Sequence, residues 1–411
     1  MKVKTRIVLA KNHKVGGDTV KNVINSFGYR KNLTFLLPKP FKNSMAYPHG
    51  MTSQNLMALP KGKPDIWVYH TIFNSQKFRS MFPNDTVYIT ILREPFSQLK
   101  SVWNYYKLSS KFNISEDGPA GIATFLDSPE KYDMKCDHGS RYPFCFTRNP
   151  MAVDLGFPMQ ENMKILQTQQ QKQKISKDFV RQIEGQFSLV MIMEHFDESL
   201  VLLKREMCWT LKDILYYVAN NRNYSWRHVE IPTTQKKQHK QWSSVDYALY
   251  NYFNKTLWNK IERSENDFNG ELRFFRHVNA KMKEHCDQLL RGEACSVYGS
   301  VLKISESRWS PGFDIDLEDC ELIKRTSQCH FALQAERAIR VLGKQQDIDP
   351  SNWRKGRENV DLPFLQLSPP DGCTNFLNIL RGIRQASRRK ETEERKAHSS
   401  KRVLEPKPLS K

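Results

Sequence analysis

The sequence predicts an α/β fold in three layers, with a mainly parallel central sheet between two layers of helices. Strand-like and helix-like segments alternate along the first half of the chain, an order typical of parallel sheets. Residues 189–193 are apolar at nearly every position, as in a strand that is buried on both faces. The chain has 411 residues, of which 39% are hydrophobic, so one large domain or two ordinary ones can form.

The first predicted unit is a strand at 6–10, a polar turn at 11–18 and a helix from Thr19 onward. Apolar residues at Val20, Val23, Ile24 and Phe27 have the spacing of one helix face. The N–H groups and the dipole of a helix start favour a phosphate-like anion.

In that turn, Lys14 adds a cation beside Gly16 and Gly17, and Thr19 adds a hydroxyl at the start of the helix. A Walker A loop needs its Lys directly after the last glycine, whereas Lys14 precedes both glycines, so we do not expect an ATP or GTP loop. An ordinary turn with a surface lysine is the alternative at this point.

A second unit has a strand at 85–91, the sequence Leu-Arg-Glu-Pro at 92–95 and a helix at 96–106. Pro95 suits the first turn of a helix. Arg93 lies at the carboxyl end of the strand, where open α/β sheets bind ligands, and Ser101 follows two helical turns later. An Arg fork and a hydroxyl so placed can hold a second phosphate.

The remaining elements are expected in the following order. Strands are predicted at 33–37 and 65–69. Helices are predicted at 75–81 with Asn74 as N-cap, 118–126, 160–174, 198–207 with Asp197 as cap, and from Trp242 onward, while 38–64, 148–157 and the basic segment 233–241 are predicted as loops.

Two histidines are candidates for a general base. His70 ends the predicted strand at 65–69, on the sheet edge expected to carry Lys14 and Arg93, and it is the preferred base. A structural histidine at a strand end is the alternative. His13 is the rival, because it lies in the glycine turn itself.

At this point the sequence resembles the galactose-3-O-sulfotransferase family of Golgi carbohydrate sulfotransferases. The family loop K-T-H-K-T/S-A/G-G/S-S-T, which binds the 5′-phosphosulfate of PAPS (3′-phosphoadenosine 5′-phosphosulfate), corresponds to 11–19 here, KNHKVGGDT. Its 3′-phosphate motif, L-R-[DE]-P with a Ser eight residues after the Arg, corresponds to 92–95 and Ser101. Further similar segments are 32–35, 148–157, 187–209 and 242–258.

The resemblance implies a P-loop-like sulfotransferase fold with a helical C-terminal part. It implies PAPS as co-substrate, without a metal, and assigns donor binding to the following residues: Lys11, Lys14, Gly16, Gly17, Asp18, Thr19, Arg93 and Ser101. Lys14 would also stabilise the transferring group, and His70 or His13 would serve as base.

The implied reaction moves a sulfuryl group to the 3-hydroxyl of a terminal galactose on a glycolipid or glycoprotein. The family is anchored in the Golgi membrane and works in the lumen, but no anchor segment stands before the first predicted strand.

Three positions depart from the family loop: Asn12, Val15 and Asp18. A carboxylate about 4 Å from a phosphosulfate costs roughly 1 kcal/mol in water and more when shielded. Asp18 can instead cap the helix. A family member with weakened or lost PAPS binding is therefore the second hypothesis.

The net charge of +20 suits an anionic partner. A basic nucleic-acid-binding protein is the third hypothesis, but no nucleic-acid motif is present, so we expect no nucleic-acid partner. Six of the eight cysteines form pairs nine residues apart, at 136/145, 286/295 and 320/329, which fits local disulfides in an oxidising lumen. Zinc-site spacings are absent from the sequence.

The predicted organisation is a sulfotransferase domain over 1–385 and a basic tail over 386–411 without fixed structure. Within the domain, the nucleotide-binding core covers about 1–210 and the helical part about 211–385.

Overall fold

The computed structural model describes residues 2–38, 50–57, 62–133, 146–158, 168–219, 224–264, 267–291, 301–325, 330–331 and 333–335. Its centre is a parallel sheet in the order β2-β1-β3-β4. The strands are β1 (Ile7–Ala10), β2 (Ile66–Trp67), β3 (Val87–Leu92) and β4 (Leu189–Ile192), and all are buried. The predicted α/β fold with a parallel sheet is confirmed.

The register brings the two predicted phosphate motifs together. β1 and β3 are parallel neighbours, with Ile7 opposite Val87 and Ala10 opposite Thr90. Both strands therefore end at one sheet edge, and the connections that follow them, 11–16 and 93–94, begin there. The hydroxyl of Thr90 donates to the carbonyl of Ala10 at 2.8 Å and joins the two strand ends.

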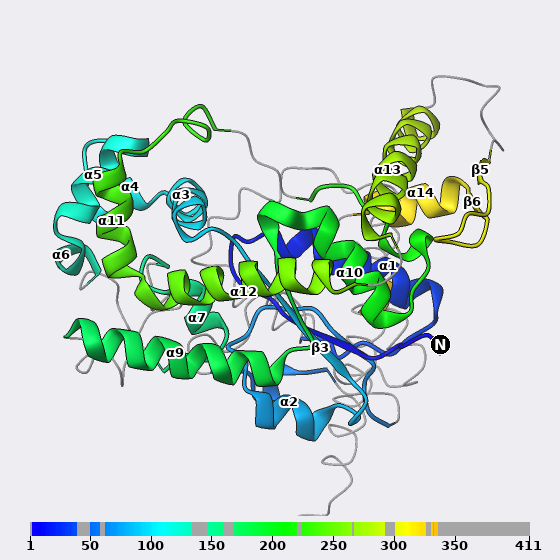
Figure 1. Cartoon of the computed structure of the whole chain (residues 1–411), viewed down its shortest axis with the longest axis horizontal. Helices are drawn as coiled ribbons and strands as arrows, with labels where there is room; N and C mark the ends of the chain where they lie inside the picture. The colour runs from blue at the N-terminus through cyan, green and yellow to red at the C-terminus, as the bar shows by residue number, and fades with distance from the viewer. Residues whose placement is uncertain are drawn as a thin grey trace, which may run out of the picture.

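Helices lie on both sides of the sheet. In Figure 1, α2 (Ser75–Met81) lies below the strands, whereas α10 (Phe196–Met207) and α12 (Ser244–Glu262) lie above them. The side chain of Asn74 caps α2, as predicted, by accepting from the N–H of Lys77.

A second apolar cluster lies around α3 (Pro95–Tyr106), α5 (Gly118–Asp127) and α11 (Thr233–Trp242). Trp103, Phe125 and Trp242 are buried in it. This cluster fixes α3, whose N-terminus follows Arg93. The Glu94 carboxylate caps that N-terminus by accepting from the N–H groups of Phe96 and Ser97.

The other helices described are α1 (Gly17–Arg30), α4 (Leu108–Phe112), α6 (Pro129–Asp133), α7 (Pro150–Asp154), α9 (Gln169–Gln186), α13 (Phe268–Arg291) and α14 (Leu317–Lys324), with short 3₁₀ turns at Ser53–Asn55, Met193–His195 and Leu211–Ile214. The described residues after 210 are mainly helical and also contain an antiparallel pair, β5 (Leu302–Ile304) and β6 (Phe313–Ile315).

The cysteine pairing differs from the prediction. Cys286 of α13 is bonded to Cys320 of α14, so neither cysteine pairs with the one nine residues away. The two helices pack together, which brings together cysteines 34 residues apart in the sequence. The expected 136/145 pair lies outside the described residues.

Five local predictions are wrong. Residues 33–37 form only an isolated bridge between Phe35 and Ile66. The basic segment 233–241 lies in α11, because His239 and Trp242 are buried on one side of it. The segment 148–157 contains the buried helix α7 rather than only a loop.

The other two concern helix starts. Helix α10 starts at Phe196, with His195 as its N-cap in place of Asp197. The predicted helix 160–174 is interrupted at Thr168, which is extended and caps α9 from Gln169 onward in a capping box with Gln171, while residues 160–167 lie outside the described residues.

The predicted tail lies outside the described residues. Within the part of the chain that is described, no helix combines the length and apolar character needed to cross a bilayer.

Candidate functional site

The loop between β1 and α1 turns at Gly16. Gly16 is the N-cap of α1 and has a left-handed backbone with φ 82°. A Cβ at this position would lie 2.3 Å from the sulfur of Met193, a flexible side chain that would have to move, so it is the left-handed backbone that favours glycine here. Helix α1 therefore starts at Gly17, and its first-turn N–H groups are directed to the end of the helix, as an anion site requires.

Two of the three departures from the family loop are buried in the protein. The amide of Asn12 donates to the carbonyl of Ile91 at 3.0 Å and ties the loop to β3. Val15 is fully buried in the main core. Neither side chain therefore needs to face a ligand.

Asp18 is not the helix cap that was predicted as an alternative, because Gly16 occupies that position. Its carboxylate instead accepts from the Lys11 ammonium at 2.6 Å. Burial alone would raise the pKa of Asp18, but the charge of Lys11 outweighs it and lowers the pKa below its ordinary range. The charge that threatened to repel a phosphosulfate is thus paired within the protein.

His70 is held by Lys11 at both ring nitrogens. Nδ1 lies 2.9 Å from the Lys11 carbonyl, which can only accept, so Nδ1 carries the hydrogen. Nε2 lies 2.8 Å from the Lys11 ammonium and accepts from it. Burial, and then the charge of Lys11, lower the pKa of His70 well below 6.5, so this ring is neutral.

His13 is held by Asp154 at the end of α7. Nδ1 lies 2.9 and 3.0 Å from the two carboxylate oxygens, and the main-chain N–H of His13 donates to Oδ2 at 2.7 Å. The rings of His13 and His70 stack, with centroids 4.0 Å apart. The structure therefore brings both predicted histidines together.

Arg93 contacts the glycine loop directly. Its guanidinium donates to the carbonyl of Lys14 at 3.2 Å. The Lys14 ammonium lies 3.7 Å from the ring centroid of Tyr105 on α3, a cation–π contact. Lys14, Arg93 and the turn of two glycines thus form one cationic site at the sheet edge.

The two hydroxyls predicted to bind the donor, those of Ser101 and Thr19, lie on different helices, α3 and α1. Ser101 is half-buried in α3. The oxygen of Thr19 accepts from the N–H of Ala219 at 3.0 Å, which leaves its hydrogen to be donated.

Sequence reasoning missed Tyr105 and Lys21. Tyr105 lies four residues after Ser101, and this spacing was the signal that both share one face of α3. Lys21 is buried in α1, with its ammonium 4.2 Å from the ring centroid of Tyr69. No sequence signal distinguished Lys21 from an exposed helical lysine.

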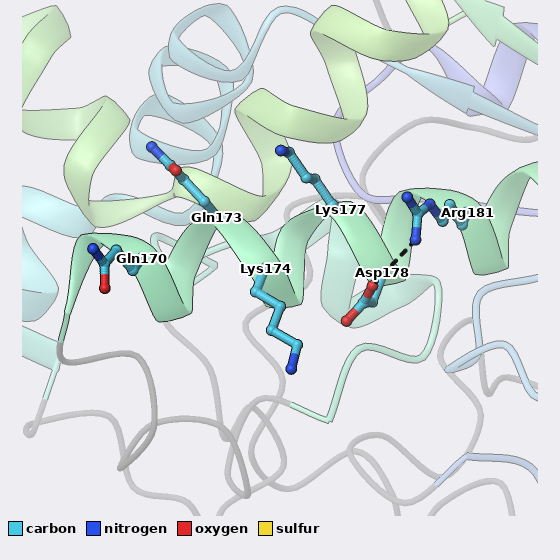
Figure 2. Close-up of a pocket in the computed structure, with 6 residues that line it drawn as sticks. All are labelled: Gln170, Gln173, Lys174, Lys177, Asp178 and Arg181. Atoms are coloured by element: carbon cyan, nitrogen blue, oxygen red, sulfur yellow. Dashed lines mark ion pairs between the residues drawn. The ribbon is translucent and has the colours of Figure 1, made fainter.

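A hollow of about 380 Å³ lies elsewhere, on the surface of α9 (Figure 2). The six side chains that line it all belong to that helix: Gln170, Gln173, Lys174, Lys177, Asp178 and Arg181. Figure 2 shows the Asp178–Arg181 ion pair there. None of these residues belongs to the sheet edge. Among the described residues, no group of three or more His, Cys, Asp or Glu side chains could hold a metal ion.

The fold and this site define an α/β protein with a glycine loop at a helix N-terminus, two stacked histidines and an arginine at one sheet edge. The family model for galactose-3-O-sulfotransferase matches residues 1–305, and the chain belongs to that family. The predicted membership is therefore confirmed, and by family the chain is a carbohydrate sulfotransferase.

Curated relatives agree with this assignment. The chain is 30% identical to galactose-3-O-sulfotransferase 3 of Mus musculus over 321 residues, 77% of this chain and 70% of the relative. It is 31% identical to galactose-3-O-sulfotransferase 2 of Sus scrofa over 261 residues, 62% of each chain. It is 28% identical to galactosylceramide sulfotransferase of Bos taurus over 285 residues, 68% of this chain and 63% of the relative.

Proposed function

We propose that this protein transfers the sulfuryl group of PAPS to the 3-hydroxyl of a terminal galactose on a glycolipid or glycoprotein. The observation that carries the proposal is the contact between Arg93 and Lys14. These residues come from two motifs that the sequence assigns to the two ends of one donor, and they meet at one sheet edge.

The residues present fit such a donor. The loop 11–19 offers helix N–H groups, the Gly16 turn and two lysines for the 5′ end, while Arg93 and Ser101 would hold the 3′-phosphate. The donor supplies an activated sulfuryl group with a nucleotide phosphate as leaving group. The chain itself orients the reactants, offsets negative charge with Lys14 and receives a proton on a histidine.

The proposed sugar acceptor and cellular location are inferred mainly from the family. The relatives' names specify galactose and galactosylceramide, which supports a galactose-terminated acceptor. A Golgi-luminal location is supported by the Cys286–Cys320 disulfide, because such bonds persist in oxidising compartments. Membrane association is proposed on the family alone.

Calorimetric titration of the purified full chain with adenosine 3′,5′-bisphosphate (PAP), the product of PAPS, tests donor binding. We expect saturable 1:1 binding, and weaker binding of adenosine 5′-phosphate, which lacks the 3′-phosphate. The second hypothesis, a family member that has lost PAPS binding because of Asp18, predicts no heat from PAP in the native chain and recovered binding in Asp18→Ser.

A further inference from the structure

We propose that Asp154 is a positioning residue that makes His13 the general base of the proposed sulfuryl transfer. This inference rests on the proposed function and assigns the base within it. It differs from the sequence-based preference for His70.

The tautomer of His13 follows from its partner. Asp154 is 2% exposed, and a carboxylate can only accept hydrogen bonds. Nδ1 of His13, at 2.9 Å, must therefore carry the hydrogen, and Nε2 is left as the basic nitrogen. A buried carboxylate behind Nδ1 also stabilises the positive charge that the ring acquires when Nε2 takes a proton.

His70 is held in a way that opposes this role. Its Nε2 faces the ammonium of Lys11, and a proton taken there would place two positive charges 2.8 Å apart. His70 instead supports the ring of His13 by stacking on it.

The carboxylate of Asp154 is fixed by an exchange of helix caps. Asp246 in the first turn of α12 accepts from the N–H groups of Met151 and Ala152, at the start of α7. In return, Asn149 accepts from the N–H groups of Val245 and Asp246, at the start of α12. Because α7 has only five residues, these caps determine where Asp154 lies at its other end.

Asp154 also holds the segment that follows His70. Its main-chain carbonyl accepts from the N–H of Phe73 at 2.9 Å. Gly156, with φ 92°, allows the close approach, because a Cβ there would lie 2.4 Å from the Phe73 carbonyl oxygen. One short segment therefore contacts both His13 and the residues that follow His70.

In the proposed step, the galactose hydroxyl oxygen forms a bond to sulfur while its proton moves to Nε2 of His13. The bond from sulfur to the nucleotide phosphate breaks, and PAP leaves with its electron pair. The imidazolium then returns the proton to water.

Asp154→Asn tests the assignment because it keeps the shape and removes the charge. We expect kcat to fall by about 100-fold or more, with PAP affinity within about threefold of the native chain. Asp178→Asn, the same change on the exposed face of α9, is the control and should leave kcat unchanged. PAP affinity equal to that of the native chain would show that the Asp154→Asn variant folds. If that variant does not fold, His13→Gln replaces it in the test and should lower kcat by a similar factor.

Nitrogen-15 NMR of histidine-labelled full chain gives a readout independent of activity. We expect the His13 signal to show hydrogen on Nδ1 in the native chain and a shift toward the other tautomer in Asp154→Asn. Hydrogen on Nε2 in the native chain, or full turnover in His13→Gln, would overturn the inference. A native chain without any transfer would refute the proposed function, while the tautomer measurement would still decide the role of Asp154.

Discussion

The carboxylate of Asp18 and the ammonium of Lys11 are paired 2.6 Å apart within the loop that joins β1 and α1. The Lys11 ammonium therefore donates both to Asp18 and to His70. The pair offsets the negative charge of Asp18, and it also lowers the positive charge that the loop presents.

Removing that carboxylate should strengthen donor binding. In Asp18→Ser the charge of Lys11 becomes available to the ligand, and we expect PAP to bind about three- to tenfold tighter in low salt. Asp18→Asn removes the charge but keeps the shape of the side chain, and we expect it to bind PAP as tightly as Asp18→Ser does. Calorimetry would contradict this view of the loop if either variant bound PAP more weakly than the native chain.

Lys14→Ala should reduce both PAP affinity and kcat/KM. A charge-assisted hydrogen bond contributes about 1.5–3 kcal/mol, which corresponds to about 10- to 150-fold. Lys174→Ala, an exposed lysine on α9, is the matched control, with no expected change. Unchanged PAP affinity in Lys14→Ala would remove this residue from the site.

Arg93→Ala should remove the discrimination between PAP and adenosine 5′-phosphate. If Arg93 holds the 3′-phosphate, PAP affinity falls by tenfold or more and the affinity for adenosine 5′-phosphate changes less. Arg93→Lys keeps the positive charge but lacks the two-pronged guanidinium, so its PAP affinity should lie between those of the native chain and Arg93→Ala. Equal losses for both ligands would mean that Arg93 acts only through the Lys14 carbonyl.

The disulfide prediction now concerns a different pair. Non-reducing peptide mapping should recover Cys286 linked to Cys320. Closing a loop of this length stabilises a protein by about 3–4 kcal/mol in the chain-entropy estimate, so Cys320→Ser should lower the thermal midpoint by several degrees. Cys208→Ser is the control, because Cys208 is a free thiol. Recovery of a Cys286–Cys295 peptide would contradict the structure.

Because Lys21 is buried, we expect the free energy of unfolding to depend on pH. Burial, and then the charge of Lys11, lower the pKa of Lys21 to about 7, against about 10.5 when unfolded. Between these values the unfolded chain binds more protons, so this lysine makes stability rise with pH, by up to about 1.4 kcal/mol per unit. Lys21→Met should flatten the unfolding free energy between pH 7 and 10. An unchanged slope would show that Lys21 stays charged in the fold.

The sequence predicted the elements that rest on local patterns. The strands β1, β3 and β4, the helix α2 and its Asn74 cap follow from apolar spacing and capping chemistry. The shared sheet edge of the two predicted phosphate motifs followed from the rules for parallel sheets.

The predictions that were wrong concern elements whose contacts come from residues distant in the sequence. The segment 148–157 looked like a loop because α7 is short and its caps come from α12. The basic segment 233–241 is helical because one face packs on a cluster built around α3 and α5. The cysteine pairing depends on how α13 and α14 pack, and sequence spacing does not contain that information.

Sulfate transfer by the protein can be measured directly. The purified full chain is incubated with sulfur-35-labelled PAPS and an oligosaccharide or glycolipid ending in β-galactose, and the labelled product is mapped by methylation analysis. We predict one sulfate ester at O3 of the terminal galactose, no labelled product when that galactose is removed from the acceptor, and loss of product in Lys14→Ala. Saturable PAP binding without any labelled product, or sulfate at another hydroxyl, would contradict the proposed function.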